Sequence, residues 1–173
     1  MPPRERPLDA PRTNDLPLQR ETKIDRTSAV EIVIARIFDS TVNHVFKAWS
    51  EPDLFKRWWV PRSMGISLES CEMRVQTGGT YRLSFGAGMD FFGRYLEVVP
   101  HSRIVWTNDE GGENGQITTV TFSGQGDQTR VVMSERYPTE AALDAVGAGS
   151  AESVHETFNQ LDALLAEMEG HAL

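Results

Sequence analysis

The side chains that could do chemistry are few, and they do not fall into a catalytic motif. The chain has four histidines and one cysteine, and it contains no His-x-x-x-His, no Gly-x-Ser-x-Gly and no glycine-rich loop followed by Lys-Ser. Those patterns are the signals of metal centres, serine hydrolases and phosphate-binding loops. We therefore assign no catalytic residue, and we expect neither a metal ion nor a cofactor.

Three charged or titratable side chains are candidates for a polar contact inside a pocket. Glu97 and Arg82 fall in expected strands, so each could face inward or outward, and an inward charge would need a partner or a ligand group. The alternation of the neighbouring apolar residues favours the outer face for Arg82 and leaves Glu97 open to both orientations. His155 could act as an acid or base if it faced a cavity, although a solvent-exposed position is favoured.

The stretch DLFKRWWVP places Trp58 directly beside Trp59. Neighbouring residues cannot share one face of a helix or a strand, so the two indoles must point in different directions. We expect one to pack in the core and the other to face a cavity. Trp58 is favoured for the core because it lies at helical spacing from Leu54 and Phe55.

Length and composition indicate one domain with a core of ordinary size. The chain has 173 residues, 39% of them hydrophobic, and no run approaches the roughly 18 apolar residues that a membrane span requires. The start lacks an apolar stretch like that of a signal peptide, and Cys71 is the one cysteine, expected to pack as a small apolar group. We therefore expect a soluble, cytoplasmic protein without a membrane partner.

Charge and proline content differ along the chain. The first 26 residues hold five prolines and few large apolar residues, which is the composition of a flexible tail, so a single domain is expected over residues 27–170. Residues 27–173 hold eleven basic and twenty acidic side chains. Such an acidic surface repels phosphate, so we expect no nucleic-acid partner.

Periodicity predicts the elements that must position these residues. Residues 29–38 alternate like a strand, apolar residues at helical spacing follow over 42–49, and Pro52 suits the first turn of a second short helix. Turn signals then separate six further strands, at 64–75, 81–85, 89–99, 101–108, 116–123 and 129–137. A long final helix is expected over 151–168, with GAGS at 147–150 as an interruption before it.

These elements predict an α+β fold, in which a curved antiparallel sheet of six or seven strands wraps around the long C-terminal helix. The sheet and the helix each have an apolar face, and each must cover the other. A single helix, roughly 10 Å across, cannot fill a strongly curved sheet. The two short helices after the first strand therefore close one end or leave a pocket there.

Three segments carry a family resemblance: RIFDSTVNHVFKAWSEPDLFKRWWVP, CEMRVQTGGTYRL and FGRYLEVVPHSRIVWT. In this order and spacing they resemble the Activator of Hsp90 ATPase homologue-like proteins of the START-like (SRPBCC) superfamily, over residues 29 to about 168. The resemblance implies a helix-grip fold with a pocket between helix and sheet. Relatives often begin the last helix with a Gly-Trp pair whose tryptophan lines the pocket. Ser153 and Val154 stand here instead, which implies an enlarged or reshaped pocket.

The fold and the resemblance together predict a ligand pocket between the sheet and the last helix. Its expected residues are Trp58, Trp59, Phe85, Tyr95, Glu97, Trp106, Val154 and Phe158. Plain core packing is the alternative for each aromatic residue. The favoured function is a protein that binds a small apolar or aromatic ligand.

Two other functions compete with ligand binding alone. One is a cofactor-independent enzyme of the cyclase or hydrolase kind, with Glu97 or His155 in proton transfer. The other is a co-chaperone that stimulates an Hsp90-type ATPase, which the family name suggests. We rank a chaperone partner last, because the chain has no room for the separate N-terminal domain of the eukaryotic activator. An exposed edge strand could also pair two copies into a homodimer.

Overall fold

The computed structural model describes residues 21–112 and 115–170, apart from the side chains of residues 146–151. Its strands are β1 (Lys23–Arg26), β2 (Glu31–Phe38), β3 (Ser70–Met73), β4 (Thr80–Ser84), β5 (Asp90–Val99), β6 (Arg103–Thr107), β7 (Ile117–Gln125) and β8 (Gln128–Arg136). Its helices are α1 (Val42–Ser50), α2 (Pro52–Phe55) and α3 (Glu140–Gly170), with a 3-10 turn at Arg62–Met64.

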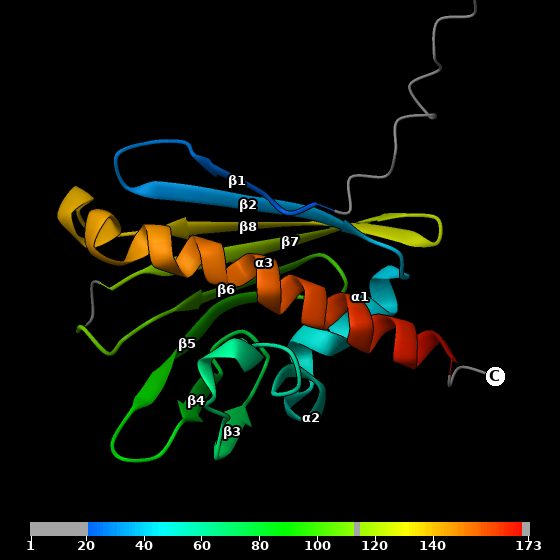
Figure 1. Ribbon diagram of the computed structural model, residues 1–173, viewed down its shortest axis with the longest axis horizontal. Helices are drawn as coiled ribbons and strands as arrows, with labels where there is room; N and C mark the ends of the chain where they lie inside the picture. Colours follow the sequence, from blue (N-terminus) through cyan, green and yellow to red (C-terminus); the bar gives the residue numbers. More distant parts are fainter. Residues whose placement is uncertain (1–20, 113–114, 171–173) are drawn as a thin grey trace, which may run out of the picture.

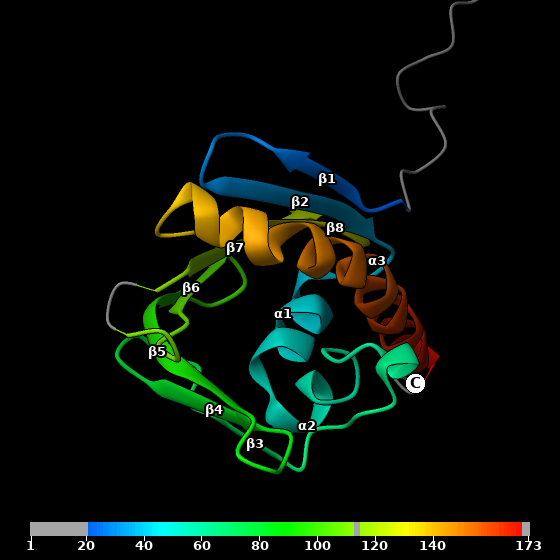
Figure 2. The same ribbon diagram turned by 60° about the vertical axis from the view of Figure 1, so that its left-hand side comes forward.

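The α+β architecture predicted from the periodicity is confirmed. The eight strands form one antiparallel sheet in the order β1-β2-β8-β7-β6-β5-β4-β3. Helix α3 lies along one face of this sheet (Figure 1), and the sheet curves from β1 to β3 around the side on which α1, α2 and α3 lie (Figure 2). None of the helices in the described ranges has the length and apolar character needed to traverse a bilayer.

Strand β2 shows how the sheet and α3 cover each other. Its burial alternates, with Ile32, Ile34 and Phe38 on the inner face. This is the period-2 pattern of a strand with one face covered. On α3, Phe158 meets Phe38 edge-on, with the ring centroids 5.4 Å apart. The aromatic contact joins the first long strand to the last helix.

Arg36 also lies on the inner face of β2, where it is 5% exposed. Its guanidinium donates to the Asn159 side-chain oxygen at 2.7 Å and to the Asp162 carboxylate, both on α3. The same group donates to the hydroxyl of Thr22 at 3.3 Å. These bonds satisfy the two terminal nitrogens of the buried guanidinium and join α3 to β2.

The structure corrects the boundary of the expected tail. Residues 1–20 lie outside the described residues, but Lys23–Arg26, expected to belong to the tail, form β1 and pair with Ile32–Ala35 of β2. The five prolines of the expected tail all precede residue 18, so the backbone N–H groups of residues 23–26 can join a ladder. This strand adds the eighth member to a sheet expected to have six or seven.

The expected interruption at GAGS is also wrong, because α3 runs without a break from Glu140 to Gly170. Glycine inside a helix costs only about 1 kcal/mol relative to alanine. The alanines at 145, 148 and 151 favour the helical state on either side of Gly147 and Gly149. A local turn signal was therefore weaker than the helical tendency of its surroundings.

Candidate ligand-binding cavity

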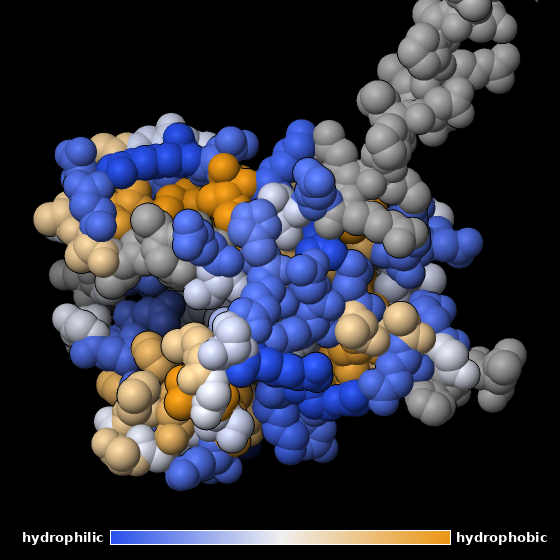
Figure 3. Space-filling model, in the orientation of Figure 1, coloured by the Kyte–Doolittle hydropathy of each residue, from blue (hydrophilic) through white to orange (hydrophobic). Residues whose placement is uncertain are grey.

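A cavity of about 370 Å³ lies between α3, the inner face of the sheet and the segment that follows α2. Figure 3 shows a hollow in the surface beside α3, with hydrophobic side chains gathered below it. Most of the wall is apolar. Its residues include Trp49, Tyr81, Leu83, Ile104 and Met133. The size and the lining are those of a small-molecule site.

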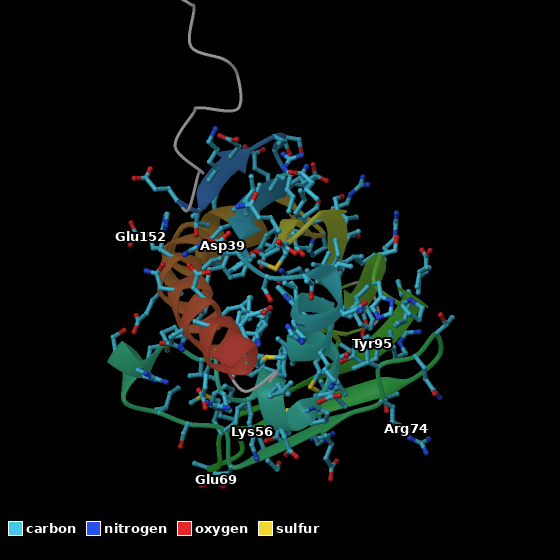
Figure 4. All side chains as sticks on the ribbon, turned by 90° about the vertical axis from the view of Figure 1, so that its right-hand side faces the viewer. Asp39, Lys56, Glu69, Arg74, Tyr95 and Glu152 are labelled. Atoms are coloured by element: carbon cyan, nitrogen blue, oxygen red, sulfur yellow. The ribbon has the colours of Figure 1, made fainter. Side chains whose placement is uncertain are left out.

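Six of the eight predicted pocket residues lie on the wall of this cavity. They are Trp59, Phe85, Tyr95, Trp106, Val154 and Phe158. They come from the segment after α2, from the region of β4 to β6 and from α3, so only the folded sheet and helix bring them together. In Figure 4, Tyr95 lies inside the curve of the sheet, whereas Arg74 and Glu69 extend outward from it. The role of the six wall residues toward a ligand stays a prediction.

Trp58 does not line the cavity, so its place in the predicted pocket is wrong. Its side chain is fully buried, its indole N–H donates to the carbonyl of Ala48 at 2.9 Å, and its ring lies 4.7 Å from that of Trp49. The helical spacing that favoured Trp58 for the core is the physical reason. Trp58 fastens the segment after α2 to α1.

Its neighbour Trp59 is half-buried and lies on the cavity wall. The Trp59 ring stacks on Phe55 with the centroids 4.8 Å apart. Helix α3 holds this segment through Gln160, whose amide N–H donates to the carbonyls of Trp58 and Val60 at 3.1 and 2.8 Å. The two adjacent tryptophans thus have separate positions, one in the core and one on the cavity wall.

Glu97 does not line the cavity either. The pairing of β5 with β6 shifts register between Tyr95 and Glu97. Such a bulge changes which residues face inward, so Glu97 is exposed and pairs with Arg103 at 3.3 Å. The prediction that Glu97 lies in the pocket is wrong for this reason.

Two other polar candidates also point away from the cavity. Arg82 is exposed, where it pairs with Asp90 at 2.7 Å and lies over the ring of Phe92. His155 is exposed on α3. Glu97 and His155, the two groups proposed for proton transfer in an enzyme, therefore both lie outside the cavity. Among the described residues, no three His, Cys, Asp or Glu side chains gather closely enough to hold a metal ion.

Cys71 is half-buried beside Met73, with the two sulfur atoms 3.4 Å apart. Burial raises the pKa of its thiol to about 11. The thiol therefore stays uncharged near neutral pH, in agreement with its expected role as a small apolar group.

A buried carboxyl group that the sequence analysis missed lies on the cavity wall. Glu135 is 7% exposed and sits on the inner face of β8. The strand register places Glu135 opposite Thr118 of β7. Thr118 in turn lies opposite Trp106 of β6, and Trp106 lies opposite Tyr95 of β5. These four residues form a row across the sheet, polar at one end and aromatic at the other. The alternation of Thr129, Val131 and Met133 on the inner face was the signal that could have revealed Glu135.

The surroundings of Glu135 disfavour its charged form. Its carboxylate accepts a hydrogen bond from the Tyr137 hydroxyl at 3.1 Å, which favours the charge, but burial has the larger effect and raises its pKa above the ordinary 4.5. Further polar side chains on the wall belong to Asn108, Gln116 and Thr157. The polar end of the cavity lies where β6 and β8 end and β7 begins.

The aromatic end depends on close packing between β4, β5 and β6. The hydroxyl of Tyr81 donates to the carbonyl of Thr107 at 2.6 Å. Gly93 of β5 lies close to the same carbonyl. A Cβ atom on Gly93 would lie 1.9 Å from that carbonyl oxygen, so no larger residue fits. Burial raises the pKa of both Tyr81 and Tyr95, which therefore remain neutral hydroxyl donors.

The sequence of this chain matches a known protein family over most of its length. The model of the family described as "Activator of Hsp90 ATPase homolog 1-like protein" matches residues 39–166. The chain belongs to this family. A comparison with curated proteins found no match.

Solved structures of several bacterial proteins share the fold of this chain. A protein of Rhodobacter sphaeroides is 25% identical, with a TM-score of 0.75 over 85% of this chain and 99% of its own. A protein of Nitrosomonas europaea is 20% identical, with a TM-score of 0.73 over 84% and 99%. A protein of Mycobacterium smegmatis is also 20% identical, with a TM-score of 0.70 over 86% and 99%. These similarities confirm the helix-grip fold expected from the resemblance.

The two positions at which the family resemblance implies a Gly-Trp pair lie on the helix side of the cavity. Ser153 and Val154 both line it. Neither side chain is large enough to replace an indole. The enlarged or reshaped pocket that the resemblance implied at these two positions stays a prediction.

The raised pKa of Glu135 predicts how stability changes with pH. Because the folded protein holds this proton more tightly than the unfolded chain, the free energy of unfolding should fall as pH rises from the ordinary 4.5 through the folded pKa. Glu135→Gln keeps an acceptor for Tyr137 and carries no charge. We expect it to raise the melting temperature by a few degrees at pH 7.5 and to have little effect at pH 4. Thermal unfolding of both proteins from pH 4 to 8 measures this difference, and parallel curves would contradict it.

Proposed function

We propose that the protein binds a small molecule with an apolar or aromatic body in the cavity between α3 and the sheet. The observation that carries this proposal is the wall itself, in which aromatic side chains from three parts of the chain surround about 370 Å³ of space. Aromatic and aliphatic walls exclude water and favour ligands that remove apolar surface from solvent. Family membership is compatible with this role and does not name a ligand.

The entrance to the cavity supports the same proposal. Met64, Ile66, Met89 and Phe91 line the cavity and are also exposed, by 57%, 40%, 52% and 42%. These four residues, here called the apolar rim, lie where the cavity meets solvent. Exposed apolar side chains that border a pocket mark a binding site more often than chance exposure does. An apolar molecule would contact the rim before the interior.

A thermal-shift screen of the purified protein against several hundred apolar and aromatic metabolites tests this function. Selective binding to the folded state should raise the melting temperature by an amount that grows with ligand concentration. Because Trp59 and Trp106 line the cavity, the same compounds should change the tryptophan emission. If no compound does both, ligand binding in this cavity is not the function.

A cofactor-independent enzyme is a second candidate, favoured by Glu135 rather than by the groups first considered. A carboxyl group with a raised pKa on the wall of an apolar cavity is suited to proton transfer. Compounds found in the screen would be incubated with the protein and analysed for conversion. Recovery of every compound unchanged would leave binding alone.

A further inference from the structure

We propose that the cavity selects ligands that join an apolar or aromatic body to one cationic nitrogen, and that this nitrogen lies against Glu135. This inference rests on the proposed function and names the class of ligand. Its first basis is the charge of the wall. Among the described residues that line the cavity, Glu135 is the one carboxylic acid, and none is Lys, Arg or His.

The carboxyl group of Glu135 has no cationic partner within the described part of the chain. It forms no ion pair with the described residues, and it accepts a hydrogen bond from the neutral hydroxyl of Tyr137 at 3.1 Å. A buried carboxylate without a counter-charge is costly. An ammonium or imidazolium group on a ligand would supply the missing charge, whereas a carboxylate or phosphate would meet a like charge and no cation.

The rest of the row across the sheet suits the other half of such a ligand. Trp106 lies two strands from Glu135 and Tyr95 lies three strands away, which corresponds to roughly 10 and 14 Å at the usual strand spacing. A ring system can therefore lie against the aromatic residues while a short arm reaches the carboxyl group. Aromatic faces also attract cations, so the wall adds to the preference for a positive ligand.

The charge of the whole domain acts in the same direction. The excess of acidic over basic side chains in residues 27–173 makes a negative potential that raises the local concentration of cations and lowers that of anions. Thr118 lies opposite Glu135 on β7, and Thr157 of α3 is a further hydroxyl group on the cavity wall. These hydroxyls can accept the further protons of an ammonium group.

The test uses three probes that share one ring system and differ in charge: 2-naphthylmethylamine, 2-naphthylmethanol and 2-naphthoic acid. Their affinities for the full-length protein are measured by isothermal titration calorimetry at pH 7.5. We expect the amine to bind at least ~10-fold more tightly than the alcohol, because a charge-assisted hydrogen bond replaces a neutral one. The naphthoate should bind most weakly.

Glu135→Gln should lower the affinity of the amine at least ~10-fold, to that of the alcohol, and change the affinity of the alcohol by less than about threefold. Glu97→Gln is the matched control, because it removes an exposed carboxylate outside the cavity. It should leave all three affinities unchanged. With the unmodified protein, the affinity for the amine should also fall as pH is lowered and Glu135 becomes protonated, which gives a test that needs no variant.

The outcomes distinguish failure of this inference from failure of the proposed function. Equal affinities for the amine and the alcohol, or tightest binding of naphthoate, would overturn the selection of cations while leaving apolar ligand binding intact. A loss of amine affinity in Glu97→Gln equal to that in Glu135→Gln would show that general surface charge is responsible. Failure of all three probes to bind would count against the proposed function and the inference together.

Discussion

Replacing Val154 by tryptophan should strongly weaken ligand binding while leaving the fold intact. Val154 lies on α3, is 8% exposed and lines the cavity. An indole at this position would extend into open space of about 370 Å³ rather than into packed atoms. A ligand would have to displace it, so we expect affinity to fall by about 100-fold, in line with the 1–3 kcal/mol that overpacking costs.

The matched control is Val99→Trp, which makes the same chemical change at an exposed position outside the cavity. Calorimetry with the tightest compound from the screen measures binding, and thermal unfolding confirms the fold of both variants. Affinity should be lost in Val154→Trp alone. Full affinity in a folded Val154→Trp protein would mean that the ligand binds elsewhere.

Alanine substitution of the adjacent tryptophans should separate stability from binding. Trp58→Ala removes a fully buried ring and its hydrogen bond to Ala48, so we expect a loss of about 3–5 kcal/mol in the free energy of unfolding. Trp59→Ala removes a half-buried ring from the cavity wall. It should cost about 1–2 kcal/mol in stability and lower ligand affinity about 10-fold.

Urea denaturation and calorimetry of the two variants give both quantities. Trp58→Phe is a useful third protein, because it keeps a smaller aromatic ring in the core while it removes the bond to Ala48 and part of the indole volume. It should recover most of the stability that Trp58→Ala loses. If Trp58→Ala were as stable as Trp59→Ala, the assignment of Trp58 to the core would be wrong.

The local patterns of the sequence predicted the elements because they depend on neighbours along the chain. The period-2 alternation in residues 29–38 and the helical spacing in 151–168 each report one covered face. The spacing of Trp58 from Leu54 and Phe55 likewise separated it from Trp59, although α2 itself ends at Phe55. Where two local signals disagreed, as at GAGS in α3, the sequence alone did not show which would prevail.

The composition of the cavity depended on tertiary structure. The bulge between Tyr95 and Glu97 turned Glu97 outward, and it arises from how β5 pairs with β6. Glu135 and Arg36 continue the inner faces of their strands in the same way, yet one lines a cavity and the other meets Asp162 of α3. The sequence by itself determined that each side chain faces inward. Only the packing of α3 across the sheet decided which inward residue has a partner and which faces open space, because that packing joins residues more than a hundred positions apart.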